Sequence, residues 1–234
     1  MFDPYPSDLA GCRRCPRLAA HREAVAVKKR RAYRDQEYWG APVPGFGDPA
    51  ARIVIVGLAP GAHGSNRTGR MFTGDGSGTF LYAALHRAGL ASAPVSRSRD
   101  DGMRLRDVWI TAAARCAPPG NRPTPAELVA CRGWLAHDLD ALREASVLLA
   151  LGGVAHASVL RLLQQRGLSV TLAHHPFVHG ALYRFEGLPG AEQARALPLL
   201  DAYHVSLQNT NTGRLSAAMF DEVLAAAKRE AGVP

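Results

Sequence analysis

Residues 52–78 read RIVIVGLAPGAHGSNRTGRMFTGDGSG, and they join an expected strand to an expected helix. The first five residues of this stretch form an apolar, β-branched run that is typical of a buried parallel strand. Residues 79–85, TFLYAAL, predict a helix directly after it. Seven glycines lie between 57 and 78, about three times the density of the whole chain, so the backbone there approaches another group closely or takes conformations that side chains forbid. A glycine loop between a strand and a helix indicates a ligand site at the carboxyl end of a parallel strand.

Apolar runs and helical segments alternate along the rest of the chain. Thr124, Pro125 and Glu127 form a capping box that predicts the start of a helix. The alternation predicts one α/β domain over residues 1–234, with three layers, α/β/α, and a central, mostly parallel four-stranded sheet. Residues 38–49 are rich in Pro and Gly and predict a surface loop, and 91–106 predict an irregular insertion. The further strands are expected at 107–113, 146–151, 170–173 and 199–204, and the further helices at 17–29, 124–142, 154–166 and 216–226.

The chain is basic. Its 234 residues include 28 Lys and Arg against 20 Asp and Glu, a formal net charge of +8. A positive balance of this size favours a polyanionic partner such as nucleic acid. Five cations crowd into residues 28–34, where a solvated helix end and a phosphate contact are the competing interpretations, and we favour the phosphate contact. The five are Lys28, Lys29, Arg30, Arg31 and Arg34.

No targeting or membrane segment is evident. The sequence contains no run of 18 uncharged apolar residues, and residues 1–10 lack the cationic start and apolar middle of a secretion signal. We therefore expect a cytoplasmic protein that does not associate with a membrane.

The four cysteines are Cys12, Cys15, Cys116 and Cys131. Two disulfides would be unusual in a reducing compartment. Four thiolates can bind one structural zinc ion or one [4Fe–4S] cluster, and the spacing alone does not separate these two sites.

Several motifs in this order resemble one enzyme family. The pattern Gly57-x-Ala59-Pro60-Gly61, the block from Gly69 to Gly74 and the paired cysteines resemble the iron–sulfur uracil-DNA glycosylases, and among them the type B branch, also called family 5. The similarity extends from Cys12 to about residue 215. It implies a uracil-DNA glycosylase-like fold, and a [4Fe–4S] cluster on the four cysteines that ties an N-terminal arm, about 1–50, to the core. It also implies a monomer that removes uracil from DNA by base flipping and hydrolysis and leaves an abasic site for base excision repair.

The resemblance also implies the roles of the site residues. Asp75 is the one carboxylate between Gly57 and Gly78, and it would stabilise positive charge on the sugar and orient water, with a simple helix N-cap as the alternative. His204, within the segment 203–210, would donate to the departing base. Phe72 would stack on the base, although core packing is the alternative. Backbone amides at Gly61, Ala62 and His63 would hold the base or the water.

Contacts with the rest of the DNA are implied as well. Leu207, Gln208 and Asn209 resemble the wedge that enters the minor groove, while Lys29, Arg30 and Arg31 would contact phosphates. Ala112 stands where the related type A enzymes carry an asparagine that reads the uracil edge. Its absence predicts a wider base range that includes hypoxanthine or xanthine.

The sequence also allows other interpretations of its function. His175 and His179 have metal-like spacing, but Pro176 between them argues against a helical metal site, and we favour pocket lining or phosphate contact for this cluster. The glycine loop contains no lysine, so we expect no strand-cutting lyase step. The chief rival is a non-catalytic iron–sulfur module that binds nucleic acid, and a second is a related enzyme that stays covalently attached to DNA.

Overall fold

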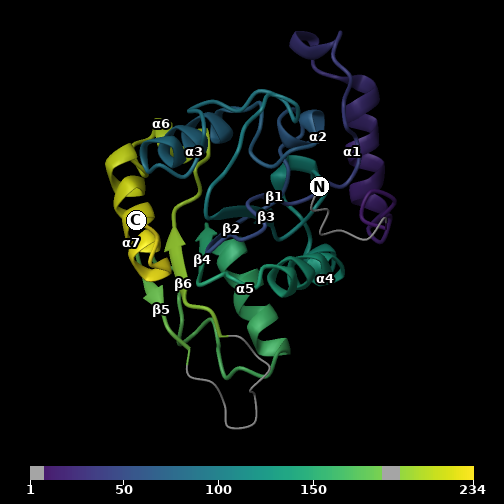
Figure 1. Ribbon diagram of the computed structural model, residues 1–234. Coiled ribbons are helices and arrows are strands. Elements are labelled where there is room, and N and C mark those ends of the chain that lie inside the picture. Colours follow the sequence, from purple (N-terminus) through teal and green to yellow (C-terminus); the bar gives the residue numbers. More distant parts are fainter. Residues whose placement is uncertain (1–7, 186–195) are drawn as a thin grey trace.

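A computed structural model describes residues 8–185 and 196–234 (Figure 1). Its centre is one sheet with the strand order β1-β3-β2-β4-β6-β5. The four inner strands are parallel, as the sequence predicts, and β1 and β5 are short antiparallel strands at the two edges. The strands are β1 Phe46–Gly47, β2 Ile53–Gly57, β3 Val108–Ala112, β4 Val147–Leu151, β5 Leu182–Tyr183 and β6 Leu199–Ala202.

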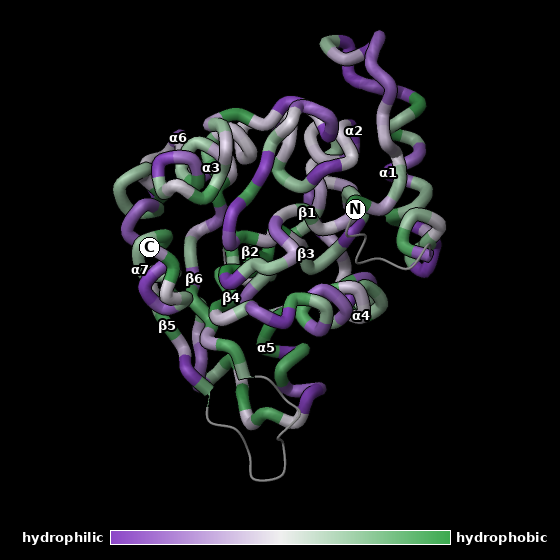
Figure 2. Tube along the Cα trace, in the orientation of Figure 1, coloured by the Kyte–Doolittle hydropathy of each residue, from purple (hydrophilic) through white to green (hydrophobic). Residues whose placement is uncertain are grey.

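Helices cover both faces of this sheet, which confirms the predicted three layers. Alternate residues of β2 face opposite sides because successive side chains of a strand point in opposite directions. Ile53 and Ile55 pack with α3 (Gly76–Arg87) and α7 (Ala217–Ala231), whereas Val54 and Val56 pack with α4 (Pro125–Ala141) and α5 (Gly153–Gln165). Figure 2 shows hydrophobic colours along β2 and β4, which are buried on both faces.

Three short or peripheral helices complete the structure. They are α1 (Pro16–Lys28), α2 (Ser65–Thr68) and α6 (Leu207–Asn211), with 3₁₀ turns at Arg31–Tyr33 and Pro119–Asn121. In Figure 1, α2, α3 and α6 gather at one end of the sheet, and α1 stands beside α2. This is the end at which β2 runs into the glycine loop, so the loop lies where the sequence places it.

Two helix starts follow from local capping. Thr124 and Glu127 form the predicted capping box of α4, and Ser216 accepts a hydrogen bond from the Met219 amide at the start of α7. In contrast, α3 begins at Gly76 and not at Thr79, because Asp75 provides an N-cap that extends the helix over the last glycines of the loop.

Several sequence expectations are corrected. Residues 170–173 form no strand: Val170 is buried, but the chain then turns outward and leaves Leu172 exposed. β1 lies inside the loop expected at 38–49, and a backbone bridge between Ala91 and Leu105 closes the insertion at 91–106. No helix among residues 8–185 and 196–234 is long and apolar enough to cross a bilayer.

Candidate active site

A cavity of about 590 Å³ lies beyond the carboxyl ends of β2 and β6. Its walls come from three parts of the chain that are distant in sequence: the glycine loop with the start of α3, the 3₁₀ turn at Pro119–Asn121, and the segment from His204 into α6. The residues that line it are Leu58, Ala59, Gly61, Ser65, Met71, Phe72, Asp75, Gly76, Ser77, Asn121, His204, Ser206, Leu207, Gln208 and Asn209.

Asp75 is both the N-cap of α3 and a wall of this cavity. Its Oδ1 accepts a hydrogen bond from the Gly78 amide at 2.9 Å. Its Oδ2 rests against the backbone of the glycine loop, where a Cβ added to Gly64 would come within 1.9 Å and one added to Gly61 within 2.8 Å. Burial raises the pKa of Asp75, and hydrogen bonds from the Gly78 and Ser77 amides partly oppose that rise.

Phe72 presents its ring to the same cavity from a strained turn. Its φ of 52° is left-handed, which is uncommon for a bulky residue. Two glycines permit this geometry: a Cβ on Gly57 would lie 2.8 Å from the ring, and one on Gly78 would lie 1.7 Å from the Phe72 carbonyl oxygen. The close approaches explain why glycines accumulate in this stretch.

His204 faces Phe72, with ring centroids 6.1 Å apart and planes inclined by 35°. It follows β6, and the Asn209 side chain fixes its backbone by donating to the His204 carbonyl at 2.8 Å. Burial lowers the pKa of His204, so the imidazole is neutral at pH 7 and offers one N–H donor.

The predicted wedge residues lie at the rim of the cavity, in α6. Leu207 is 53% exposed, and its methyl groups lie over Gly76. Gln208 is also exposed, whereas Asn209 is half-buried and committed to the His204 carbonyl. The two exposed side chains are therefore free to reach a ligand larger than the cavity.

Three predicted or discussed positions lie outside the cavity lining. His63 pairs through Nδ1 with the Tyr38 hydroxyl at 3.0 Å, and burial lowers its pKa. Ala62 and Ala112 also lie outside the lining, and Ala112 is buried at the end of β3. Asn121 does line the cavity although we did not predict it, because nothing local relates its turn to the glycine loop.

The predicted phosphate contacts lie on the arm. Lys29 ends α1 and donates from Nζ to the Arg34 carbonyl, while Arg30 and Arg31 are exposed. α1 stands beside α2 (Figure 1), and the Arg30 amide donates to the Tyr38 hydroxyl, which pairs with His63 of the glycine loop.

Two of the three histidines in the segment 171–181, His175 and His179, have structural partners. His179 stacks on Tyr203 with ring centroids 4.7 Å apart, and its Nδ1 accepts from the Tyr203 amide. His175 packs edge-on against Tyr183, and its carbonyl accepts from the buried His156.

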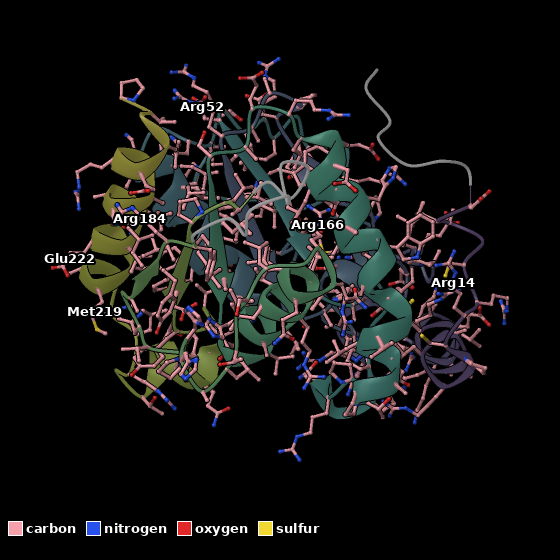
Figure 3. All side chains as sticks on the ribbon, turned by 90° about the horizontal axis from the view of Figure 1, so that it is seen from below. Arg14, Arg52, Arg166, Arg184, Met219 and Glu222 are labelled. Atoms are coloured by element: carbon pink, nitrogen blue, oxygen red, sulfur yellow. The ribbon has the colours of Figure 1, made fainter. Side chains whose placement is uncertain are left out.

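The four cysteines line one small cavity between the arm and the core, together with Arg14, Arg22 and Trp134. Figure 3 shows sulfur atoms beside α1, near the labelled Arg14. Two donors already point at sulfur: Arg22 Nη1 lies 2.8 Å from Cys116 Sγ, and the Arg115 amide lies 3.2 Å from Cys131 Sγ.

This second cavity fits an anionic sulfur-bound group. Arg22 Nε and Trp134 Nε1 are buried donors that find no hydrogen-bond partner among residues 8–185 and 196–234. Burial raises the pKa of Cys116, and that of Cys131 to about 12, so a bound metal would have to displace thiol protons. Among the described residues, no group of three metal-binding side chains is arranged to hold a metal ion. Four cysteines on one tetrahedral zinc ion would have their sulfur atoms about 3.8 Å apart. The four cysteines of a [4Fe–4S] cluster each bind a different iron, so their sulfur atoms lie further apart.

Fold and pocket together define a three-layer α/β protein with a carboxylate and an imidazole in one cavity beyond its parallel strands. The family model described as "Uracil DNA glycosylase superfamily" matches residues 44–228. The chain is 54% identical over 231 residues to the type-5 uracil-DNA glycosylase of Thermus thermophilus, which covers 99% of both chains. It is 50% identical over 228 residues to the protein of that name from Mycobacterium leprae, and 45% identical over 231 residues to that from Pyrobaculum aerophilum. These matches cover 97% and 99% of this chain, respectively, and 94% of each relative.

The chain belongs to the uracil-DNA glycosylase superfamily, and within it to the type-5 uracil-DNA glycosylases.

Proposed function

We propose that this protein is a monofunctional DNA glycosylase that removes uracil from DNA and leaves an abasic site. The observation that carries the proposal is that Asp75 and His204 line one cavity beyond the parallel strands. The names of the relatives support the same activity. A base inside a duplex is out of reach, so the nucleotide must flip out, at a cost of a few kcal/mol.

Asp75 acts on the sugar side of the reaction. The bond between C1′ and the base nitrogen breaks, and its electron pair leaves with the base. The ionised carboxylate stabilises the positive charge that develops on the sugar. Water then bonds to C1′, and Asp75 accepts the proton that the water loses. The Gly78 and Ser77 amides favour the ionised form that this role requires.

His204 acts on the base side. Its neutral imidazole donates a hydrogen bond toward the negative charge on the departing base, while the Phe72 ring stacks on the base. Asn121 and Gly61 line the same cavity, and the Asn121 side-chain amide and the Gly61 backbone would supply further polar contacts for the base or the water. The backbone amides at Ala62 and His63, one and two residues beyond Gly61, would be further base contacts.

The DNA contacts follow from exposure and charge. Leu207 and Gln208 at the rim would enter the vacated stack, with Asn209 behind them. Lys29, Arg30 and Arg31 would contact phosphates next to the glycine loop. We propose that hypoxanthine and xanthine are also substrates, because Ala112 offers no side-chain hydrogen bond to discriminate between bases.

Cys12, Cys15, Cys116 and Cys131 would hold a [4Fe–4S] cluster, which would supply a structural link between the arm, about 1–50, and the core of a single domain. The support is their shared cavity and its unpartnered donors. Cys12, Cys15, Cys116 and Cys131 form no disulfide with one another, which also suits a cytoplasmic protein. We propose that the protein acts as a monomer.

A uracil-containing duplex tests the activity. Incubation with the wild-type protein should create alkali-labile sites, and Asp75→Ala should suppress them while DNA binding survives. Binding without alkali-labile sites would instead identify a non-catalytic module, and a DNA adduct in a denaturing gel would identify a covalent reaction. Analysis for iron and sulfide tests the metal site, where zinc without iron would contradict the cluster.

A further inference from the structure

Arg22 is a buried cation on the inner face of α1, with 3% of its surface exposed. Within the described part of the chain, its one ion-pair partner is Glu23, whose Oε1 lies 3.5 Å from Arg22 Nη2. The same Oε1 also accepts a hydrogen bond from Arg13 Nη1 at 2.6 Å, so Arg22 shares this carboxylate, and a further negative charge beside its buried guanidinium would stabilise it.

The guanidinium faces the cysteine cavity. Nη1 donates to Cys116 Sγ at 2.8 Å, and Nη2 donates to the Cys12 carbonyl at 3.1 Å. The remaining donor, Nε, is buried and has no hydrogen-bond partner in the part of the chain that the structure describes. Arg22 therefore contacts two of the four predicted metal ligands, one through sulfur and the other through the backbone.

The backbone of Arg22 faces the opposite way, toward the glycine loop. Its carbonyl accepts from Asn66 Nδ2 at 3.2 Å, and Asn66 is fully buried in α2. The Asn66 backbone amide in turn donates to the Gly61 carbonyl at 3.0 Å. The carboxylate of Asp75 rests on Gly61 and Gly64. An unbroken series of contacts thus runs from Cys116 through Arg22, Asn66 and Gly61 to Asp75.

We propose that Arg22 is a positioning residue that couples the filled cysteine site to the placement of Asp75. Thiolate sulfur bound to a metal is an anionic acceptor, and charge-assisted hydrogen bonds to such acceptors are the stronger ones. A neutral thiol would hold the guanidinium weakly, α1 would loosen, and Asn66 would lose the carbonyl that orders the glycine loop. The inference rests on the proposed glycosylase function and on the metal site.

The test compares Arg22→Gln with Arg22→Lys in the metal-loaded protein. Arg13→Gln is the matched control, because Arg13 also neighbours the cysteines and pairs with Glu23 but is exposed. Arg22→Gln should make the reduction potential of the cluster more negative, since a positive charge beside Cys116 is lost. It should also speed hydrogen exchange of the amides in 61–67 and slow single-turnover uracil release between about two- and thirtyfold. Arg22→Lys should restore most of the potential, and Arg13→Gln should leave both the exchange in 61–67 and the rate of uracil release unchanged.

If Arg22→Gln does not retain its metal, Asn66→Ala provides a second test of the same coupling. It should leave the potential and the visible absorbance unchanged while it speeds exchange in 61–67 and slows uracil release. The inference is overturned if exchange in 61–67 matches the control in both variants, or if the protein binds zinc or no metal. A wild-type protein that releases no uracil would refute the proposed function itself.

Discussion

The carboxylate of Asp75 lies directly on the backbone of Gly64, which leaves no room there for a side chain. A Cβ at Gly64 would come within 1.9 Å of Oδ2 and 2.9 Å of the Asp75 Cβ. The backbone of the glycine loop thus fits closely around one carboxylate. The same carboxylate caps α3 through its other oxygen, so helix, loop and reactive group are held in one arrangement.

Gly64→Ala is expected to displace Asp75 and to slow uracil release by about 10²-fold, the cost of a misplacement of about 1 Å. Single-turnover kinetics on a uracil duplex measures it. Gly133→Ala is the matched control, because its Cβ would meet no atom nearer than 3.9 Å and alanine favours a helix. Equal rates for both variants would contradict the close fit between the Gly64 backbone and the Asp75 carboxylate.

Asp75→Asn should abolish most activity without loss of the helix cap, since asparagine caps as well as aspartate. We expect a loss of roughly 10²- to 10⁴-fold in the single-turnover rate. Asp75→Ala should be equally inactive but should also lose about 1 kcal/mol of stability with the cap. If Asp75→Asn were active and Asp75→Ala were not, the residue would be a cap and not a catalytic group.

The Asp75→Asn variant should be more stable than the wild type at pH 7. The folded pKa of Asp75 is raised above the ordinary value of about 3.9. Its contribution to stability is therefore present below that ordinary pKa and is lost as the pH rises through the folded pKa. Thermal unfolding should show a higher Tm for Asp75→Asn at neutral pH, with the difference shrinking toward pH 4. A constant difference across this range would contradict the raised pKa.

The pKa of His204 is lowered, so its neutral form should persist below the ordinary histidine pKa of about 6.5. We expect uracil release to be insensitive to His204 protonation at neutral pH, and His204→Ala to slow it by roughly 10²- to 10³-fold. His174→Ala is the control, because His174 is exposed in a turn. A rate that follows the titration of an ordinary histidine would contradict a buried, neutral donor.

Leu207→Ala should weaken action on duplex DNA by roughly tenfold and spare single-stranded DNA, because only a duplex needs its stack refilled. The ratio of kcat/KM on the two substrates gives the result. Val178 is 52% exposed, against 53% for Leu207, but does not line the cavity, which makes Val178→Ala the matched control. Equal losses on both substrates would argue against a wedge.

Ala112→Asn should narrow the base range, with hypoxanthine release falling about ten- to hundredfold relative to uracil release. Ala112→Val controls for volume without adding a hydrogen bond. A panel of duplexes that each carry one deaminated base measures the ratio. An unchanged ratio would show that the base range is decided elsewhere, for instance by Asn121.

Local patterns in the sequence were sufficient for the core of the fold. The β-branched run before Gly57 predicts its buried strand because both faces of a parallel sheet are covered. Thr124 and Glu127 predict a helix start because their hydrogen bonds join residues three apart. The density of glycine indicates a site, since close approach of backbone to other groups excludes side chains.

Which groups share a cavity depends on contacts between segments that are distant in sequence. The edge strands β1 and β5 are two residues long and carry too little pattern to be predicted. Asn121 reaches the cavity, and His63 turns away to Tyr38, through contacts between distant segments. Arg22 likewise contacts both Cys116 and Asn66, which are distant from it in the sequence. Such contacts depend on how packed layers meet in space, and local spacing along the chain does not specify that.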